Sequence, residues 1–341
     1  MSRSRKGPGR PGLRWAPHIP MLGLCVAVVG CGPADEEGPL ELTFGHVGAP
    51  GSLFAQSAEA FAERVNARLG DQARVVVYGS SQLGSDDVLL QKLKLGTVDL
   101  ALPSTILSSQ IEAFGLFEMP YLVQDREHMG RIEGEIVWPT LVPLAEAAGY
   151  RIIGVWENGF RHITNNVRPI RTPEDLKGIK LRTPRGIWRV RLFQRFGANP
   201  TPMPLSEVFI ALQTGVMDGQ ENPLAQIYSS RLHEVQRYLS LTSHVYTPAF
   251  VTVSATHFAR LPEAVQQILS EEARAVQAFV YETGEEMDRS LLAQIQESGV
   301  EVNQADRASF LQGSQAIYDE FSGAVASGKS LIERALPLAY P

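Results

Sequence analysis

Basic side chains are concentrated in one segment of this chain, residues 151–195. The segment holds eleven Lys and Arg residues against three acids, although the whole sequence has a formal net charge of −6. A local excess of +8 in an acidic chain concentrates positive potential, which suits an anionic ligand. Most of these side chains are expected to form a solvated face, so the residues that bind must be identified from the surrounding pattern.

Arg182 has the clearest such pattern. Thr172 begins a short predicted helix, and residues 179–183 then alternate between apolar and polar side chains, as a half-buried strand does. Pro184 ends that strand and places Arg182 near its carboxyl end, where ligands bind in open α/β sheets. A guanidinium there can hold a carboxylate through two parallel hydrogen bonds. The alternative is an ordinary surface arginine at a strand end.

The first half of the chain predicts parallel βαβ units and therefore an α/β fold. Residues 40–47, 74–78 and 98–102 are rich in β-branched and apolar side chains, as strands are. Segments with apolar residues at helical spacing separate them, and Ser85 is the expected N-cap of the second helix. Ser104 follows the third strand at its carboxyl end, which makes it a candidate for the ligand site.

Longer elements follow. Residues 150–156 predict a strand, after which Gly159 is expected to turn the chain into the basic segment. Residues 246–254 predict a strand that returns to the first half of the fold. Residues 262–298 predict one very long helix of about 55 Å, more than a single lobe needs, with a bend or split at Gly284.

The N-terminal residues are typical of an export signal. Residues 1–30 contain five bases and no acids, and their apolar run at residues 19–29 is too short to span a bilayer. Small residues precede Cys31, as in a lipoprotein signal that is cleaved before a lipidated cysteine. The alternative is an ordinary secretory signal in which Cys31 is incidental. Residues 31–39 are expected to be a tether.

Removal of residues 1–30 would leave Cys31 as the sole cysteine and a net charge of −11, because those residues hold five of the 31 bases and none of the 37 acids. A lone cysteine excludes an intramolecular disulfide and a thiolate metal site. The acidic balance argues against a nucleic-acid partner. No later segment has transmembrane length, so membrane contact is expected only through a lipid at Cys31.

Motifs for catalysis are not found in the sequence. It contains no Gly-x-Ser-x-Gly, no His-Glu-x-x-His and no Walker loop, and its seven histidines are scattered. We therefore expect neither enzyme activity nor a cofactor or metal. Ser80 or Ser81 paired with His46 is the one catalytic arrangement that the sequence leaves open.

Six motifs in order resemble the solute-binding subunits of tripartite ATP-independent periplasmic (TRAP) transporters, in the dicarboxylate-binding-protein family. The resemblance covers about residues 40–332, and it is specific because the motifs occur together. They are Ser-Gln-Leu-Gly at 81–84, Gly-Phe-Arg at 159–161, Asp-Leu-Lys-Gly-Ile-Lys-Leu-Arg at 175–182, Gly-Ala-Asn-Pro-Thr-Pro-Met at 197–203, Ala-Leu-Gln-Thr-Gly at 211–215 and Asp-Gly-Gln-Glu-Asn-Pro at 218–223.

The resemblance implies a two-lobed, type II-like periplasmic-binding-protein fold with a long helix across both lobes. Lobe I would comprise residues 40–158 and about 247–286, and lobe II residues 159–246 and about 287–341. The protein would be periplasmic, would close over a small carboxylate and would deliver it to the small and large membrane subunits of a TRAP transporter. A receptor subunit that senses the same acid is the alternative function.

The resemblance also implies roles for individual residues. Arg182 would form the main salt bridge with the ligand carboxylate, Arg161 a second polar contact, and Asn222 would orient the ligand. Leu205 and His46 would line the pocket. Trp188, which lies on the helix expected after the strand of Arg182, would either line the pocket or pack that helix.

The substrate is less narrowly defined. Two arginines suit a dicarboxylate or a uronate, whereas an apolar wall at Trp188 would suit an aromatic or branched acid. Family members that take sialic acid carry an acidic residue at the position of Pro103, which argues against that substrate here.

Overall fold

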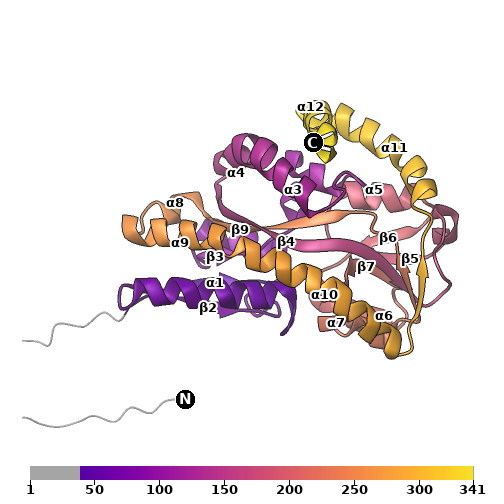
Figure 1. The fold of residues 1–341 in the computed structure, drawn as a ribbon, viewed down its shortest axis with the longest axis horizontal. Coiled ribbons are helices and arrows are strands. Elements are labelled where there is room, and N and C mark those ends of the chain that lie inside the picture. The colour runs from indigo at the N-terminus through magenta and orange to yellow at the C-terminus, as the bar shows by residue number, and fades with distance from the viewer. Residues whose placement is uncertain (1–38, 341) are drawn as a thin grey trace, which may run out of the picture. The chain divides into compact units, whose positions relative to one another are not determined.

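The computed structural model describes residues 39–340, so the predicted signal peptide, Cys31 and nearly all of the tether lie outside the described residues. Hydrogen-bonded strands follow one another in the order β2-β1-β3-β9-β4-β7-β5-β6, while β8 pairs with β4 and β10 pairs with β8 (Figure 1). The strands are β1 (Leu40–Gly45), β2 (Ala73–Tyr78), β3 (Leu100–Ala101), β4 (Tyr150–Asn165), β5 (Lys180–Thr183), β6 (Asn199–Pro202), β7 (Gly219–Pro223), β8 (Tyr238–Leu241), β9 (Tyr246–Ser254) and β10 (Glu301–Gln304).

Helices cover these strands, and none of those within residues 39–340 is long and apolar enough to cross a membrane. The α-helices are α1 (Leu53–Leu69), α2 (Asp86–Leu95), α3 (Arg126–Ile132), α4 (Val142–Ala147), α5 (Ile187–Arg195), α6 (Leu205–Gln213), α7 (Leu224–Ser229), α8 (Ala255–Phe258), α9 (Glu263–Ala275), α10 (Gln277–Glu297), α11 (Arg307–Ala324) and α12 (Gly328–Ala335). Shorter 3-10 turns include η1 (Thr105–Ser109) and η4 (Pro173–Leu176), and a π-helical segment, Glu133–Leu141, joins α3 to α4.

The predicted βαβ units are confirmed. β1 pairs in parallel with both β2 and β3, and α1 and α2 are the connecting helices. The Ser52 hydroxyl caps α1 by accepting a hydrogen bond from the amide of Ala55, at 3.2 Å. Gly96 ends α2 in the left-handed conformation that glycine adopts without strain. The carboxyl ends of these strands thus reach one edge of the sheet.

Strand β4 belongs to both halves of the strand arrangement. Its residues up to Phe160 pair with β9, whereas those from Arg161 onward pair with β7 and β8. The prediction that the strand ends near Trp156 and turns at Gly159 is wrong. A register shift between Glu157 and Gly159 absorbs one extra residue, and Gly159 has the positive φ of 118° that this bulge requires. The ladder therefore continues instead of turning.

The long helix predicted at residues 262–298 is two helices, α9 and α10, which run along β4 in Figure 1. They meet at Val276 rather than at Gly284. The indole N–H of Trp156 donates to the carbonyl oxygen of Ala273 at 2.7 Å. In a continuous helix that carbonyl would accept from the amide of Gln277, so the indole competes with the helical bond at the point where the helix breaks.

Gly284 lies inside α10, where it permits close packing. A Cβ at this position would stand 3.0 Å from an oxygen of Glu157. That buried carboxylate accepts two hydrogen bonds from Arg126, at 2.6 and 2.7 Å, and one from the hydroxyl of Tyr246, at 3.2 Å. Because it has no side chain, Gly284 lets α10 pack close to this ion pair on β4. Its role is therefore in packing, and it does not act as a hinge.

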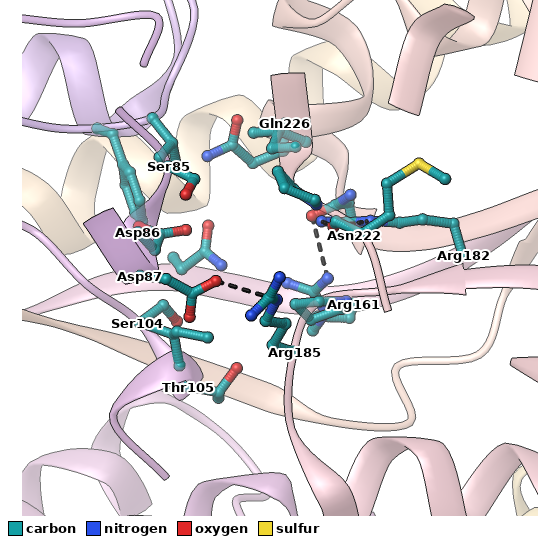
Figure 2. A pocket seen from close by; sticks show the side chains of 18 residues that line it. Ser85, Asp86, Asp87, Ser104, Thr105, Arg161, Arg182, Arg185, Asn222 and Gln226 are labelled. Carbon is teal, nitrogen blue, oxygen red and sulfur yellow. Dashed lines mark hydrogen bonds and ion pairs between the residues drawn. The ribbon is translucent and has the colours of Figure 1, made fainter. Parts of the chain in front are cut away.

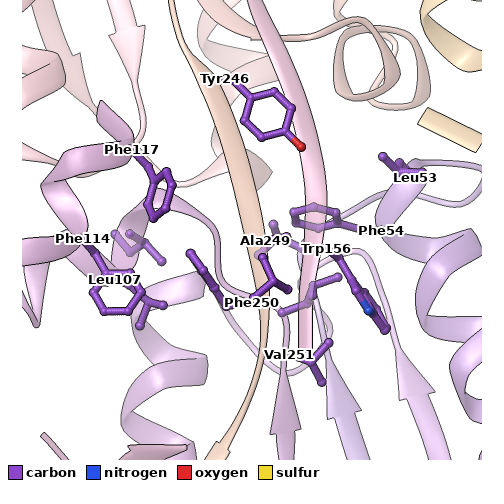
Figure 3. Close-up of a cluster of buried hydrophobic side chains, with 14 of the residues drawn as sticks. Leu53, Phe54, Leu107, Phe114, Phe117, Trp156, Tyr246, Ala249, Phe250 and Val251 are labelled. Atoms are coloured by element: carbon purple, nitrogen blue, oxygen red, sulfur yellow. The ribbon is translucent and has the colours of Figure 1, made fainter. Parts of the chain in front are cut away.

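Aromatic side chains pack on both faces of β4 and β9, as Figure 3 shows. Phe250 contacts Phe114 with ring centroids 5.2 Å apart. On the opposite side Trp156 packs against Phe61 at 5.8 Å. All four are almost fully buried, and burial of such rings is a major contribution to stability. The strands that cross the molecule are therefore held on both sides.

Replacement of Gly154 by Ala should destabilise the protein. A Cβ on Gly154, in β4, would meet the backbone oxygen of Ala273 at 2.8 Å, and the backbone cannot yield cheaply. We expect the free energy of unfolding in urea to fall by about 1–3 kcal/mol. The matched control is Gly130→Ala in α3, where nothing lies within 4 Å of the added carbon. It should be neutral or stabilising by about 0.5–1 kcal/mol, and equal losses in both variants would contradict this packing.

Candidate ligand-binding site

A cavity opens beside β4, between the N-terminus of α2 and the carboxyl end of β5 (Figure 2). It encloses about 590 Å³ of space outside protein atoms, part of it open to solvent. Its walls come from segments far apart in the sequence: Val47, Phe54, Ser85, Asp86, Asp87, Ser104, Thr105, Ile106, Asn158, Arg161, Arg182, Pro184, Arg185, Met203, Pro204, Leu205, Asn222 and Gln226.

Five of the seven predicted site residues line this cavity. They come from the N-cap of η1, from β4, β5 and β7, and from the first residue of α6. Their ligand-binding roles stay predictions. These residues are Ser104, Arg161, Arg182, Leu205 and Asn222.

His46 and Trp188 are not among the residues of this cavity wall, and Trp188 follows the second of its two predicted alternatives, which is to pack its helix. The His46 ring is buried against Phe54, and burial lowers the pKa of His46 to about 4, so the ring is neutral at pH 7. Trp188 packs its indole edge-on against Phe321 of α11, with ring centroids 5.2 Å apart. It therefore joins α5 to α11, and the apolar wall that Trp188 would have supplied for an aromatic acid is absent from this cavity.

Arg182 is a buried cation with no carboxylate partner. Its side chain is 3 % exposed, and its Nε donates to the backbone oxygen of Met203 at 2.8 Å. No ion pair among residues 39–340 includes it. Burial, followed by the charge of Arg161, lowers the pKa of Arg182 to about 9, which still leaves the guanidinium protonated at neutral pH. An anion that entered the cavity would balance this charge.

Arg161, in contrast, already has a carboxylate partner inside the protein. Its Nε lies 2.5 Å from the carboxylate of Glu221, and its Nη2 donates to Asn222 Oδ1 at 3.0 Å. Glu221 also pairs with Arg189 at 2.7 Å and with His244 at 3.1 Å. Although burial raises it, the two arginines hold the pKa of Glu221 well below its usual range. Arg161 thus orients Asn222, and it shares the Glu221 carboxylate with Arg189.

Sequence analysis assigned no ligand contact to Glu221, which precedes Asn222 in the last of the six motifs. The structure shows it as the buried anion that pairs with two arginines. A signal was present in the sequence, since an acid at the end of a buried strand needs a cationic partner and the basic segment supplies several.

Sequence reasoning also missed a set of acceptor oxygens in the cavity. Asp86 Oδ1, Asn158 Oδ1 and Gln226 Oε1 are buried and have no hydrogen-bond partner within the described residues. Burial, and then the charge of Asp87, raise the pKa of Asp86 to about 7. Asp86 and Asp87 stand in the first turn of α2, after the predicted N-cap Ser85, whose side chain makes no capping hydrogen bond.

An exposed ion pair links the two sides of the cavity mouth. Arg185, just after β5, lies 3.0 Å from the carboxylate of Asp87 on α2 (Figure 2). The Arg185 side chain is 59 % exposed, so solvent screens this pair and it contributes little stability. The pair does, however, balance the charge of Arg185, which follows Arg182 at the end of β5.

Comparison with known proteins identifies the family. Residues 44–324 match the family described as bacterial extracellular solute-binding protein, family 7. The chain belongs to this family. It is 31 % identical over 281 residues to the 2,3-diketo-L-gulonate-binding periplasmic protein YiaO of Escherichia coli K12, covering 81 % of this chain and 85 % of that protein.

Solved structures agree with this assignment to family 7. A TRAP periplasmic solute-binding protein from Bordetella, with density assigned to pantoate, has 32 % identity and a TM-score of 0.83, covering 87 % of this chain and 98 % of that one. The sugar acid binding protein DctPAm of Advenella mimigardefordensis, in complex with galactonate, has 31 % identity and a TM-score of 0.85, covering 88 % and 98 %. The two-lobed α/β fold and the TRAP resemblance are thereby confirmed.

Loss of the Glu221 charge should strongly destabilise the protein. Glu221→Gln leaves Arg161 and Arg189 buried without their anion, so we expect the unfolding free energy to fall by roughly 3–5 kcal/mol. Glu301→Gln is the matched control, because its ion pair with Arg237 is solvent-exposed and should contribute no more than about 1 kcal/mol. Similar urea midpoints for the two variants would contradict the compensating role of Glu221.

Asp86→Asn should stabilise the ligand-free protein in a pH-dependent way. A raised pKa means that the folded state holds the proton more tightly than the unfolded chain, so the ionised carboxylate costs stability. This cost is absent below about pH 4, grows as the pH rises and is complete above about pH 7. The melting temperature of the variant should exceed wild type by roughly 3 °C at pH 8 and by less at pH 5. Asp319→Asn, on the exposed face of α11, is the control and should show no such trend. If the melting temperature of Asp86→Asn exceeds that of wild type by the same amount at both pH values, the predicted cost of the ionised carboxylate is contradicted.

Proposed function

We propose that this chain captures a small organic acid outside the cytoplasm for a TRAP transporter and holds the acid's carboxylate at Arg182. The observation that carries the proposal is the uncompensated charge of Arg182, a buried guanidinium in a cavity wall with only a backbone carbonyl as partner. Burial of an unpaired charge is costly, so such a residue is retained where a ligand completes the pair.

A carboxylate suits this site for geometric reasons. Two parallel hydrogen bonds from a guanidinium match the two oxygens of a carboxylate, and removal of water strengthens their attraction. Asn222, which Arg161 holds in place at 3.0 Å, stands beside Arg182 in Figure 2 and would orient the bound acid. Leu205 and Ser104 would complete the enclosure.

Binding would draw the cavity walls together. The predicted lobes, residues 40–158 with about 247–286 and residues 159–246 with about 287–341, meet on β4, where the strand changes pairing partners between Phe160 and Arg161. A ligand that bridges both sets of residues would favour the closed arrangement over the open one. The acid itself would not be chemically altered, so the protein would act as a carrier and not as an enzyme.

The ligands named for similar proteins support an organic acid. YiaO is named for 2,3-diketo-L-gulonate, and the two solved relatives hold galactonate or density assigned to pantoate. We further propose that the chain is exported to the periplasm, that a lipid at Cys31 anchors it and that it docks on the two membrane subunits of a TRAP transporter. Mass spectrometry of the membrane fraction, with Cys31→Ser as control, would test the anchor.

Arg182→Ala should strongly weaken acid binding. A ligand that binds only the folded state stabilises it by about 2.7 kcal/mol at a hundredfold excess over Kd, which a thermal-shift screen of carboxylic acids detects. For the acid that shifts wild type most, calorimetry should show at least a roughly hundredfold weaker Kd in Arg182→Ala, and a smaller loss in Arg182→Lys, which keeps the charge but not the paired donors.

The matched control is Arg237→Ala. Arg237 is exposed and does not belong to the cavity wall, so its loss should leave the Kd of the acid unchanged. Retention of full affinity in Arg182→Ala would overturn the assignment of the carboxylate to this residue. Binding of neutral compounds without any acid would overturn the proposed function itself.

A further inference from the structure

We propose that this site selects a hydroxylated monocarboxylate, of the sugar-acid type, and that Asp86 is the residue that determines this specificity. Asp86 would accept a hydrogen bond from a ligand hydroxyl and would repel a second carboxylate. The proposal rests on the proposed function, because it takes the first carboxylate to be held at Arg182.

The first observation behind the proposal is a group of acceptor oxygens in the cavity that have no hydrogen-bond partner. Asp86 Oδ1, Asn158 Oδ1 and Gln226 Oε1 all lie in lining residues, are shielded from solvent and have no partner within residues 39–340. The Asn158 and Gln226 side chains are themselves more than nine-tenths buried. Buried acceptors are normally satisfied, so a group of three around one cavity indicates a ligand that brings donors.

The orientation of the Asn158 amide follows from its neighbours. Asn158 Nδ2 lies 3.1 Å from the hydroxyl oxygen of Thr247, and that hydroxyl donates its own hydrogen to the carbonyl of Gly159, also at 3.1 Å. Thr247 can therefore only accept from Asn158, which assigns the nitrogen to Thr247 and leaves the amide oxygen as an acceptor for the ligand.

Ser104 adds another acceptor to the same wall. Its hydroxyl hydrogen is used in a 2.6 Å bond to the carbonyl oxygen of Pro248, so its oxygen can offer only lone pairs to a ligand. Figure 2 shows Ser104 and Asp86 on the side of the cavity opposite Arg182 and Asn222. A ligand whose carboxylate lies on Arg182 thus extends toward acceptors, and hydroxyl groups are the donors that an organic acid commonly carries.

The charge inventory of the cavity disfavours a second carboxylate. Of the three arginines that line it, Arg161 is paired with Glu221 and Arg185 with Asp87, which leaves Arg182 as the one without a carboxylate partner among the described residues. The opposite wall carries Asp86, while the charge of its neighbour Asp87 is balanced by Arg185. Burial raises the pKa of Asp86, so a ligand hydroxyl that donates to it would favour the ionised form, whereas a second carboxylate would meet that charge.

Calorimetry with probes of equal chain length tests the proposal on the wild-type protein. The probes are D-galactonate, its dicarboxylate counterpart galactarate and the hydroxyl-free hexanoate, together with the shorter set D-erythronate, tartrate and butyrate. In the set that binds more tightly, the hydroxylated monocarboxylate should bind at least roughly tenfold more tightly than the other two. Tighter binding of a dicarboxylate, or of an acid without hydroxyls, overturns the selectivity.

Two variants test whether Asp86 determines that selectivity. Asp86→Leu, which removes the acceptor, should weaken binding of the hydroxylated monocarboxylate at least roughly tenfold and leave hexanoate or butyrate unchanged. Asp86→Asn, which keeps an acceptor oxygen and removes the charge, should retain that ligand within a few fold and reduce the discrimination against galactarate or tartrate. If both variants keep the wild-type ratios, Asp86 is not the determinant.

The outcomes separate this inference from the proposed function. Suppose that wild type binds a dicarboxylate most tightly and that Arg182→Ala no longer binds it. This result would support the binding of an acid at Arg182 and overturn the role of Asp86. Failure of every acid to bind wild type would overturn both. The wild-type ratios need no variant, so a variant that does not fold leaves the selectivity measurable.

Discussion

One buried carboxylate, Glu221, determines which positive charges in this protein are available to a ligand. It pairs with Arg161 and Arg189, so two arginines deep in the fold share one carboxylate inside the protein. Arg182 lies within the electrostatic reach of that unit but has no carboxylate of its own. The site therefore presents one cation without a carboxylate partner. The basic segment around it, residues 151–195, holds eleven Lys and Arg residues.

The sequence predicted the elements that place Arg182, because their patterns are local. Alternation over residues 179–183 and the proline that follows them gave a strand with Arg182 near its end, as β5 has it. The parallel strands of the first half were equally clear, since each is a short apolar run between capped helices. Five of the seven predicted site residues then reached one cavity, because the ends of those strands meet at one edge.

Features that depend on contacts between distant segments were not predictable in the same way. The break at Val276 lies beside a hydrogen bond from the indole of Trp156, which belongs to another element, and nothing in the helix itself marks the position. Trp188 faces α11 rather than the cavity for a similar reason. The acceptor group of Asp86, Asn158 and Gln226 combines α2, β4 and α7, and each residue alone has an ordinary local explanation.

The strand β4 has a further consequence, which concerns folding. Because one uninterrupted strand forms hydrogen bonds with β9 along its first part and with β7 and β8 along its last part, neither half of the sheet is complete without it. Loss of that strand removes the central partner of both halves together. We therefore expect the two halves to unfold in one cooperative transition, so that a carrier built from two moving parts melts as a single thermodynamic unit.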